Sequence, residues 1–153
     1  MSQTIKPSEL PLLVGQESEP SSWFEITQDR INLFADATND HQFIHVDEAR
    51  ASRTPFGGTI AHGYLTLSLI PYLTAEKLPA FEGLVMGINY GSDRVRFLQP
   101  VPVGSRVRAH QKYLDVTEKN PGQWLIKSQV TIEIENAAKP ALIAETLAVF
   151  VFE

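Results

Sequence analysis

The 153-residue sequence contains no cysteine. This absence excludes disulfide bonds, thiolate metal sites and a cysteine nucleophile together, and it weakly favours a reducing compartment. No uninterrupted apolar run approaches the roughly 18 residues of a transmembrane helix. The N-terminal residues 1–7 lack the cationic and apolar segments of a signal peptide. We therefore expect a cytoplasmic protein whose chemistry does not depend on a thiol.

Basic residues are also fewer than acidic residues. Lys and Arg number 13 against 18 Asp and Glu, which gives a net charge of −5. Nucleic acids and anionic membranes normally bind basic surfaces, so neither is an expected partner. Hydrophobic residues make up 43% of the chain, enough for one domain with a sizeable core. We expect a single domain over residues 1–153, with residues 1–22 as a partly irregular leader.

Helical patterns occupy the first half of the chain. Thr27 is a plausible N-cap for a short helix that ends near Thr38, and Asp47 can cap a second short helix. Residues 63–77 are apolar on every side, which is typical of a buried central helix. Pro71 within that stretch removes a hydrogen bond and is expected to bend or loosen the helix.

Strand patterns occupy the second half. Residues 123–135 alternate between apolar and polar side chains, which predicts a half-buried strand. Weaker patterns of the same kind occur at residues 84–90, 93–98, 105–116 and 141–152. One buried helix followed by a strand meander predicts an α+β fold in which an antiparallel sheet wraps the helix. The last strand is apolar on both faces and should be covered on both sides, for example by a second subunit.

The richest polar cluster lies at residues 39–47, which hold two histidines and two carboxylates. Without cysteine or a spacing such as His-Glu-x-x-His, no metal site is expected, and acid–base catalysis is the most economical use of the cluster. Asp40 and His45 are the candidate pair, because five residues around a bend can bring both to one cavity. From spacing alone, these side chains could equally be turn caps and polar loop residues.

A second segment, residues 56–63, ends where the predicted central helix begins. The N–H of Gly63 would lack an intrahelical partner and could stabilise an enolate-like oxyanion. The alternative is that Gly57, Gly58 and Gly63 only permit a tight turn and close packing. His62 is expected to have a structural role.

Taken together, the two segments resemble the signature of the MaoC-like (R)-specific enoyl-CoA hydratases. These form the hydratase 2 group of the hot-dog superfamily and include a nodulation-protein-N-like branch. The family pattern runs from an aromatic helix residue through Asp-x-Asn-Pro-x-His-x-Asp to an alanine. The matching residues here are Phe34, Asp40, His45, Asp47 and Ala51. Residues 56–57, 61–63, 95–97 and 100–104 also match, so the resemblance covers nearly the whole chain.

The sequence departs from the family pattern at three places. Gln42 and Phe43 stand where many members have Asn-Pro, and Asn39 stands where a glycine is usual. Pro71 replaces a small hydroxyl residue of some relatives, so no role for such a hydroxyl is carried over. The catalytic positions are intact, and the departures concern the shape of the pocket and hence the acyl chain accepted.

The resemblance implies a homodimeric hot-dog enzyme that hydrates trans-2-enoyl-CoA to (R)-3-hydroxyacyl-CoA, or runs the reverse dehydration. It assigns catalysis to Asp40 and His45 and the oxyanion hole to Gly63. No cofactor is implied, because the CoA or acyl-carrier thioester is part of the substrate. The alternatives are a 3-hydroxyacyl-ACP dehydratase, a hot-dog thioesterase and a non-catalytic subunit that binds acyl thioesters.

Substrate-binding candidates are less specific. Gln42, Phe56 and Tyr64 flank the proposed chemistry and could line the acyl pocket, although core packing explains them equally well. A group of strand arginines could meet the phosphates of the carrier. Their spacing of two also fits the exposed face of paired strands. This group comprises Arg94, Arg96, Arg106 and Arg108.

Overall fold

The computed structural model describes residues 4–153, and the first three residues of the expected leader lie outside this range. The elements follow the order η1 (Pro7–Leu13), β1 (Phe24–Glu25), α1 (Gln28–Thr38), α2 (Phe43–Val46), α3 (Glu48–Ala51), α4 (Gly63–Ser68), α5 (Ile70–Ala75), β2 (Leu84–Phe97), β3 (Arg106–Asn120), β4 (Gln123–Ile134) and β5 (Leu142–Phe152).

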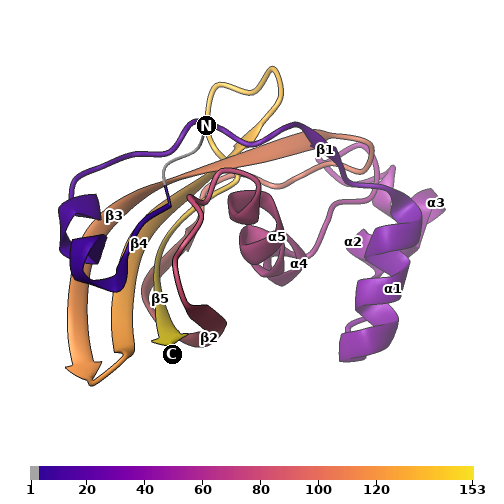
Figure 1. Cartoon of the computed structure of the whole chain (residues 1–153). Coiled ribbons are helices and arrows are strands. Elements are labelled where there is room, and N and C mark those ends of the chain that lie inside the picture. The colour runs from indigo at the N-terminus through magenta and orange to yellow at the C-terminus, as the bar shows by residue number, and fades with distance from the viewer. Residues whose placement is uncertain (1–3) are drawn as a thin grey trace.

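The strands form one five-stranded antiparallel sheet in the order β1-β3-β4-β5-β2. The sheet curls around α4 and α5, which lie on its concave side, while α1, α2 and α3 gather beyond one end (Figure 1). β5 occupies an interior position although it comes last in the chain, and β2 is an edge strand. The predicted α+β arrangement of a sheet wrapped around a central helix is confirmed.

The central helix is shorter and less continuous than residues 63–77. It is divided into α4 and α5 at Leu69, and Pro71 is the second residue of α5. Proline has no N–H to donate to the preceding turn, which explains the interruption at this point. Leu73 N still donates to Leu69 O at 3.0 Å, so the second segment continues from the first.

Both predicted helix caps are present. Thr27 Oγ1 accepts a hydrogen bond from Arg30 N at 3.2 Å, and α1 ends at Thr38 as expected. Asp47 Oδ1 accepts from Arg50 N at 3.0 Å and begins α3. These caps satisfy N–H groups that have no partner inside the helix.

The edge strand differs from the prediction. Two separate strands, 84–90 and 93–98, were expected, whereas β2 runs without a break through Gly91 and Ser92. Its register with β5 shifts between Asn89 and Gly91 and again between Ser92 and Arg94. Irregularities of this kind let the strand bend while the ladder continues on both sides.

The leader is more ordered than predicted. It contains η1, whose Leu10 and Leu13 are buried in a cluster with residues of β3, β4 and β5. The backbone then runs beside β3, with Gly15 N donating to Tyr113 O and Ser18 N to Gln111 O, both at 2.8 Å. The main core lies between the two central helices and the concave face of the sheet.

Candidate active site

Asp40 is presented by the end of α1. The helix stops at Asn39, which adopts the left-handed conformation with φ of 58°. Asparagine tolerates this conformation better than most residues, so it can serve where a glycine would otherwise end the helix. The Asp40 side chain is 53% exposed. Gln42 N lies 3.4 Å from Asp40 Oδ1, a long contact that leaves the carboxylate available for other partners.

His45 lies on the single turn α2 and is buried. Its Nδ1 is 2.7 Å from the backbone oxygen of Ile60. A carbonyl oxygen only accepts, so Nδ1 carries the proton and donates it, and Nε2 of the neutral ring has a free lone pair. Burial lowers the pKa of His45, and His62 adds to this lowering, while Ile60 O and Asp40 oppose it. The neutral form can therefore act as a base near pH 7.

His62 connects the two candidate residues. Its ring stacks on that of His45 with 3.8 Å between centroids, and its Nε2 is 2.9 Å from the backbone oxygen of Asp40. The same nitrogen is 4.0 Å from Asp40 Oδ2. Phe34 packs on the His62 ring at 4.9 Å. The side chain that was expected to be structural thus fixes the position of both members of the pair.

Asp40, His45 and His62 also resemble a set of metal ligands by composition. One potential ligand atom from each lies within 4.8 Å of the others. However, one nitrogen of each histidine faces a backbone oxygen, and the remaining His62 Nδ1 is buried without a hydrogen-bond partner among residues 4–153. The absence of a resident metal stays a prediction.

A pocket of about 350 Å³ opens beside His45. Gly63, the first residue of α4, lies in its wall. A Cβ atom at Gly63 would lie 3.0 Å from the ring of Phe97, so only glycine fits there without movement. The lining residues are His45, Ile60, Ala61, Gly63, Tyr64, Thr66, Phe97, Leu98, Gln99, Pro100, Val101 and Ala141.

Of the three predicted substrate-binding residues, Tyr64 lines this pocket and is 68% exposed. Phe56 is exposed in the loop before α4 and does not line it. Gln42 lies at the start of α2, where its backbone oxygen accepts from His45 N at 2.9 Å, and its side chain is not in the lining. Gln42 therefore contributes a backbone hydrogen bond to the helical turn that carries His45.

The strand arginines follow the exposed-face pattern. Arg106 pairs with Glu135, and Arg108 pairs with Glu133 on the adjacent strand. Glu135 and Glu133 therefore already pair with two of the guanidinium groups that were candidates for phosphate binding.

No helix within residues 4–153 combines the length and the apolar character that crossing a membrane requires.

Comparison with known proteins places the chain in one family. Residues 10–137 match the model of the MaoC like domain. Nodulation protein N of Rhizobium meliloti is 50% identical over 97% of this chain and 92% of its own length. The 3-hydroxyacyl-thioester dehydratase Z of Mycobacterium tuberculosis is 46% identical over 94% of this chain and 95% of its own length. The (R)-specific enoyl-CoA hydratase of Aeromonas caviae is 31% identical over 72% and 77%, respectively.

Solved structures agree with the sequence relatives. The (R)-hydratase from A. caviae superposes with a TM-score of 0.72 at 26% identity and covers 88% of this chain and 94% of its own. The R-hydratase PhaJ1 from Pseudomonas aeruginosa gives a TM-score of 0.71 at 28% identity, with 92% and 83% covered. The chain therefore belongs to the MaoC-like dehydratase family of the hot-dog fold, and it is a hydro-lyase.

Proposed function

We propose that the protein catalyses the (R)-specific hydration of trans-2-enoyl-CoA to (R)-3-hydroxyacyl-CoA, or the reverse dehydration. The observation that carries the proposal is the proximity of the Asp40 carboxylate to the buried His45 imidazole, within 4.8 Å. A pocket with Gly63 in its wall lies beside His45. The names of the hydratase of A. caviae and the dehydratase of M. tuberculosis support this class of substrate.

The tautomer of His45 supports its assignment as the base. With the Nδ1 proton directed to Ile60 O, Nε2 is the nitrogen that can accept a proton. In the hydration direction, His45 and Asp40 hold one water above the C2=C3 double bond. His45 takes a proton as the water oxygen attacks C3, and Asp40 takes part in returning a proton to C2. Addition from a single water gives the syn product.

Charge develops on the thioester oxygen as C3 is attacked. The N–H of Gly63, at the first position of α4, would donate a hydrogen bond to this oxygen. One such donor is typically worth about 3 kcal/mol in the transition state, and an acid–base partner contributes ~10²–10⁴ in rate. These contributions suffice without a metal or redox cofactor, and the CoA or acyl-carrier thioester is part of the substrate.

The test is an assay with crotonyl-CoA. Hydration removes the enoyl absorbance without releasing free thiol, and a stereospecific dehydrogenase then identifies the (R)-3-hydroxy product. Thiol release with an unchanged olefin would instead identify a thioesterase, and no reaction with either CoA or acyl-carrier substrates would identify a non-catalytic binding subunit. Comparison of both carriers separates the CoA hydratase from a 3-hydroxyacyl-ACP dehydratase.

We further propose that the protein is a homodimer joined along β2. This strand is 14 residues long and lies at the edge of the sheet, with unpaired backbone groups on its outer side. Its exposed large hydrophobic residues are Leu84, Val85, Met86, Ile88, Tyr90 and Phe97. A long apolar edge of this kind invites strand pairing. A second copy related by a twofold axis would offer an identical, complementary edge.

A further inference from the structure

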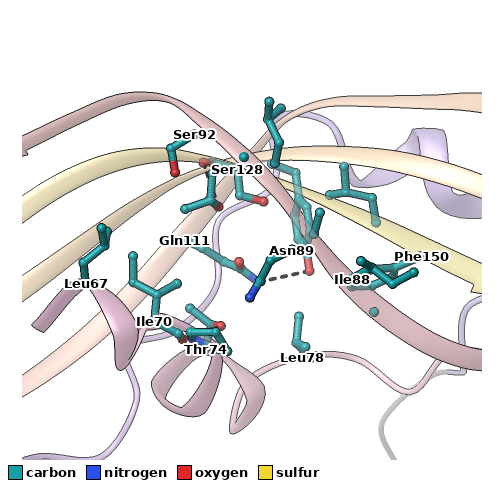
Figure 2. Close-up of a pocket in the computed structure, with 18 of the residues that line it drawn as sticks. Leu67, Ile70, Thr74, Leu78, Ile88, Asn89, Ser92, Gln111, Ser128 and Phe150 are labelled. Carbon is teal, nitrogen blue, oxygen red and sulfur yellow. Dashed lines mark hydrogen bonds between the residues drawn. The ribbon is translucent and has the colours of Figure 1, made fainter. Parts of the chain in front are cut away.

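A second, larger cavity shares no lining residue with the pocket beside His45. It has a volume of about 540 Å³ and lies between the helices α4 and α5 and the concave face of the sheet (Figure 2). Its walls include apolar side chains, among them Leu67, Ile70 and Phe150. A cavity that received only a hydrocarbon chain would be expected to be apolar throughout. This one is not.

A row of hydroxyl groups crosses the sheet within this cavity. Tyr113 on β3 is the direct cross-strand neighbour of Ser128 on β4. Ser128 is in turn the neighbour of Thr146 on β5, and Thr146 is the neighbour of Ser92 on β2. All four residues line the cavity. Four adjacent strands therefore each place one hydroxyl in the same row.

Two amide side chains line the same cavity, and Figure 2 shows Asn89 and Gln111 directed into it. Gln111 is buried, and its Nε2 donates to the Tyr113 hydroxyl at 3.3 Å. Burial raises the pKa of Tyr113 to about 12, so its hydroxyl is neutral and can donate at physiological pH.

Several of these polar groups have unused hydrogen-bonding capacity. Within residues 4–153, no protein hydrogen bond engages the side-chain oxygen of Ser92 or Ser128, or the amide of Asn89. Ser128 is only 5% exposed. Asn89 and Ser92 lie on the exposed strand β2, so Ser128 is the deep member of this set. A hydroxyl group at that depth is unfavourable unless something hydrogen-bonds to it. The arrangement is therefore suited to a ligand that supplies the missing donors or acceptors.

The charge of that ligand is restricted as well. None of the residues lining the cavity is an acid, a lysine, an arginine or a histidine. A carboxylate or an ammonium group would lose its hydration here without gaining a counter-ion. The ligand that fits is amphiphilic, with a hydrocarbon portion against the apolar walls and an uncharged hydroxyl, carbonyl or amide against the row.

Helix α4 contributes residues to the walls of both cavities. Tyr64 and Thr66 line the pocket beside His45, whereas Leu67 and Ser68 of the same helix line the larger cavity. We propose that the larger cavity binds the far portion of the acyl group and selects acyl chains that carry an uncharged hydrogen-bonding substituent over unsubstituted alkyl chains. This inference rests on the proposed function and names the substrate class of the same site.

The test compares CoA thioesters of equal chain length. One series carries a plain trans-2-enoyl chain, and the others carry a single hydroxyl or keto group placed at successive positions from C5 onward. Two new hydrogen bonds should raise kcat/KM by about tenfold for the best-placed substituent. Ser128→Ala should remove most of that preference, measured as the ratio of kcat/KM for substituted and plain chains of equal length.

The matched control is Thr131→Val. Thr131 lies on the same strand, on the face opposite to Ser128, and does not line the cavity. This variant also loses one hydroxyl from β4, and it should keep the preference of the wild-type protein.

Calorimetric binding of the corresponding saturated thioesters provides a readout that needs no turnover. Hydroxylated chains should bind about tenfold more tightly than plain chains to the wild-type protein, and Ser128→Ala should lose most of this difference. If the protein hydrates crotonyl-CoA but binds and turns over plain and substituted chains equally, this inference is wrong and the proposed function stands. Failure to hydrate any enoyl thioester would overturn the proposed function, and the binding comparison would still decide what the cavity selects.

Discussion

At the scale of single residues, the imidazole of His45 is prepared for proton transfer by its surroundings. The Ile60 carbonyl fixes the tautomer, and burial keeps the ring neutral. Asp40, in contrast, follows the end of α1, is contacted by His62 through its backbone oxygen, and has a half-exposed side chain. The pair thus joins a buried imidazole to an accessible carboxylate.

Removing either member should abolish most of the activity. We expect Asp40→Asn and His45→Gln each to lower kcat by at least ~10², because each loses an acid–base partner. Circular dichroism should show an unchanged fold. Turnover close to that of the wild-type protein in either variant would reject the catalytic assignment of that residue.

His62 should control the pKa of His45. Burial is the main cause of the lowered pKa of His45, and His62 contributes to it both by covering the ring and by its own charge. We therefore expect His62→Gln to raise the pKa of His45. A higher pKa means that the base is protonated up to a higher pH, so the acid limb of the kcat/KM profile should move to higher pH.

NMR titration of the His45 ring measures the same shift directly. His41→Gln is the control, because His41 pairs with Asp36 on the surface and lies outside the site. The assignment of His62 as a positioning residue would be wrong if its replacement left the His45 titration where it was or moved it to lower pH.

The three clustered side chains also predict how the enzyme responds to chelators. If the proposed acid–base mechanism is correct, dialysis against EDTA should leave kcat unchanged, and added zinc should not increase it. Zinc would instead be expected to inhibit by binding Asp40 and the histidines. A loss of activity on dialysis that zinc restores would identify a metal enzyme.

At the scale of elements, the start of α4 leaves no free space for a side chain at Gly63. Gly63→Ala should destabilise the protein by about 1–3 kcal/mol, because the added methyl group meets the Phe97 ring. Urea denaturation measures the change. Gly63→Ala combined with Phe97→Leu should recover stability in part, since leucine is smaller. Additive losses in the double variant would show that the ring is not the obstacle.

The elements also differ in how well they could be predicted. The caps at Thr27 and Asp47 and the alternation of β4 are local signals, and the structure agrees with each. η1 was missed because two prolines and the lack of a helical period made its residues look irregular. Gly91 and Ser92 fell outside the two predicted strands, whereas continued pairing with β5 holds them in one strand.

The site was predictable to a similar extent. Asp40, His45 and Gly63 were predicted from a local cluster and a family pattern. The structure places Asp40 close to His45, and His45 and Gly63 in the wall of one pocket. Their catalytic roles stay a prediction. His62 was expected to be structural, but its contacts with His45 and Asp40 were not predicted, because stacking between residues 17 positions apart leaves no periodic signal. The hydroxyl row was not found either, because it depends on the pairing of β2 with β5.

At the scale of the whole molecule, the open edge of β2 predicts the assembly. Light scattering should give twice the monomer mass of 17.1 kDa. Val85→Lys with Tyr90→Lys should shift the protein toward monomer, because a twofold interface brings the introduced charges of both copies together. Leu33→Lys is the matched control, since Leu33 is 70% exposed on α1 and away from the edge. A wild-type monomer would contradict the proposal.

The position of β5 has a consequence for the order in which the molecule folds. β5 is the last strand to be synthesised, yet it separates β4 from β2 in the sheet. Within residues 4–153, β5 is the one strand that pairs with β2, and it is synthesised well after β2. The apolar residues of β2 therefore stay unpaired until β5 has been made. Such sequence-distant pairing slows folding and exposes the waiting segment to aggregation. The nascent chain should therefore depend on holding chaperones until β5 has emerged.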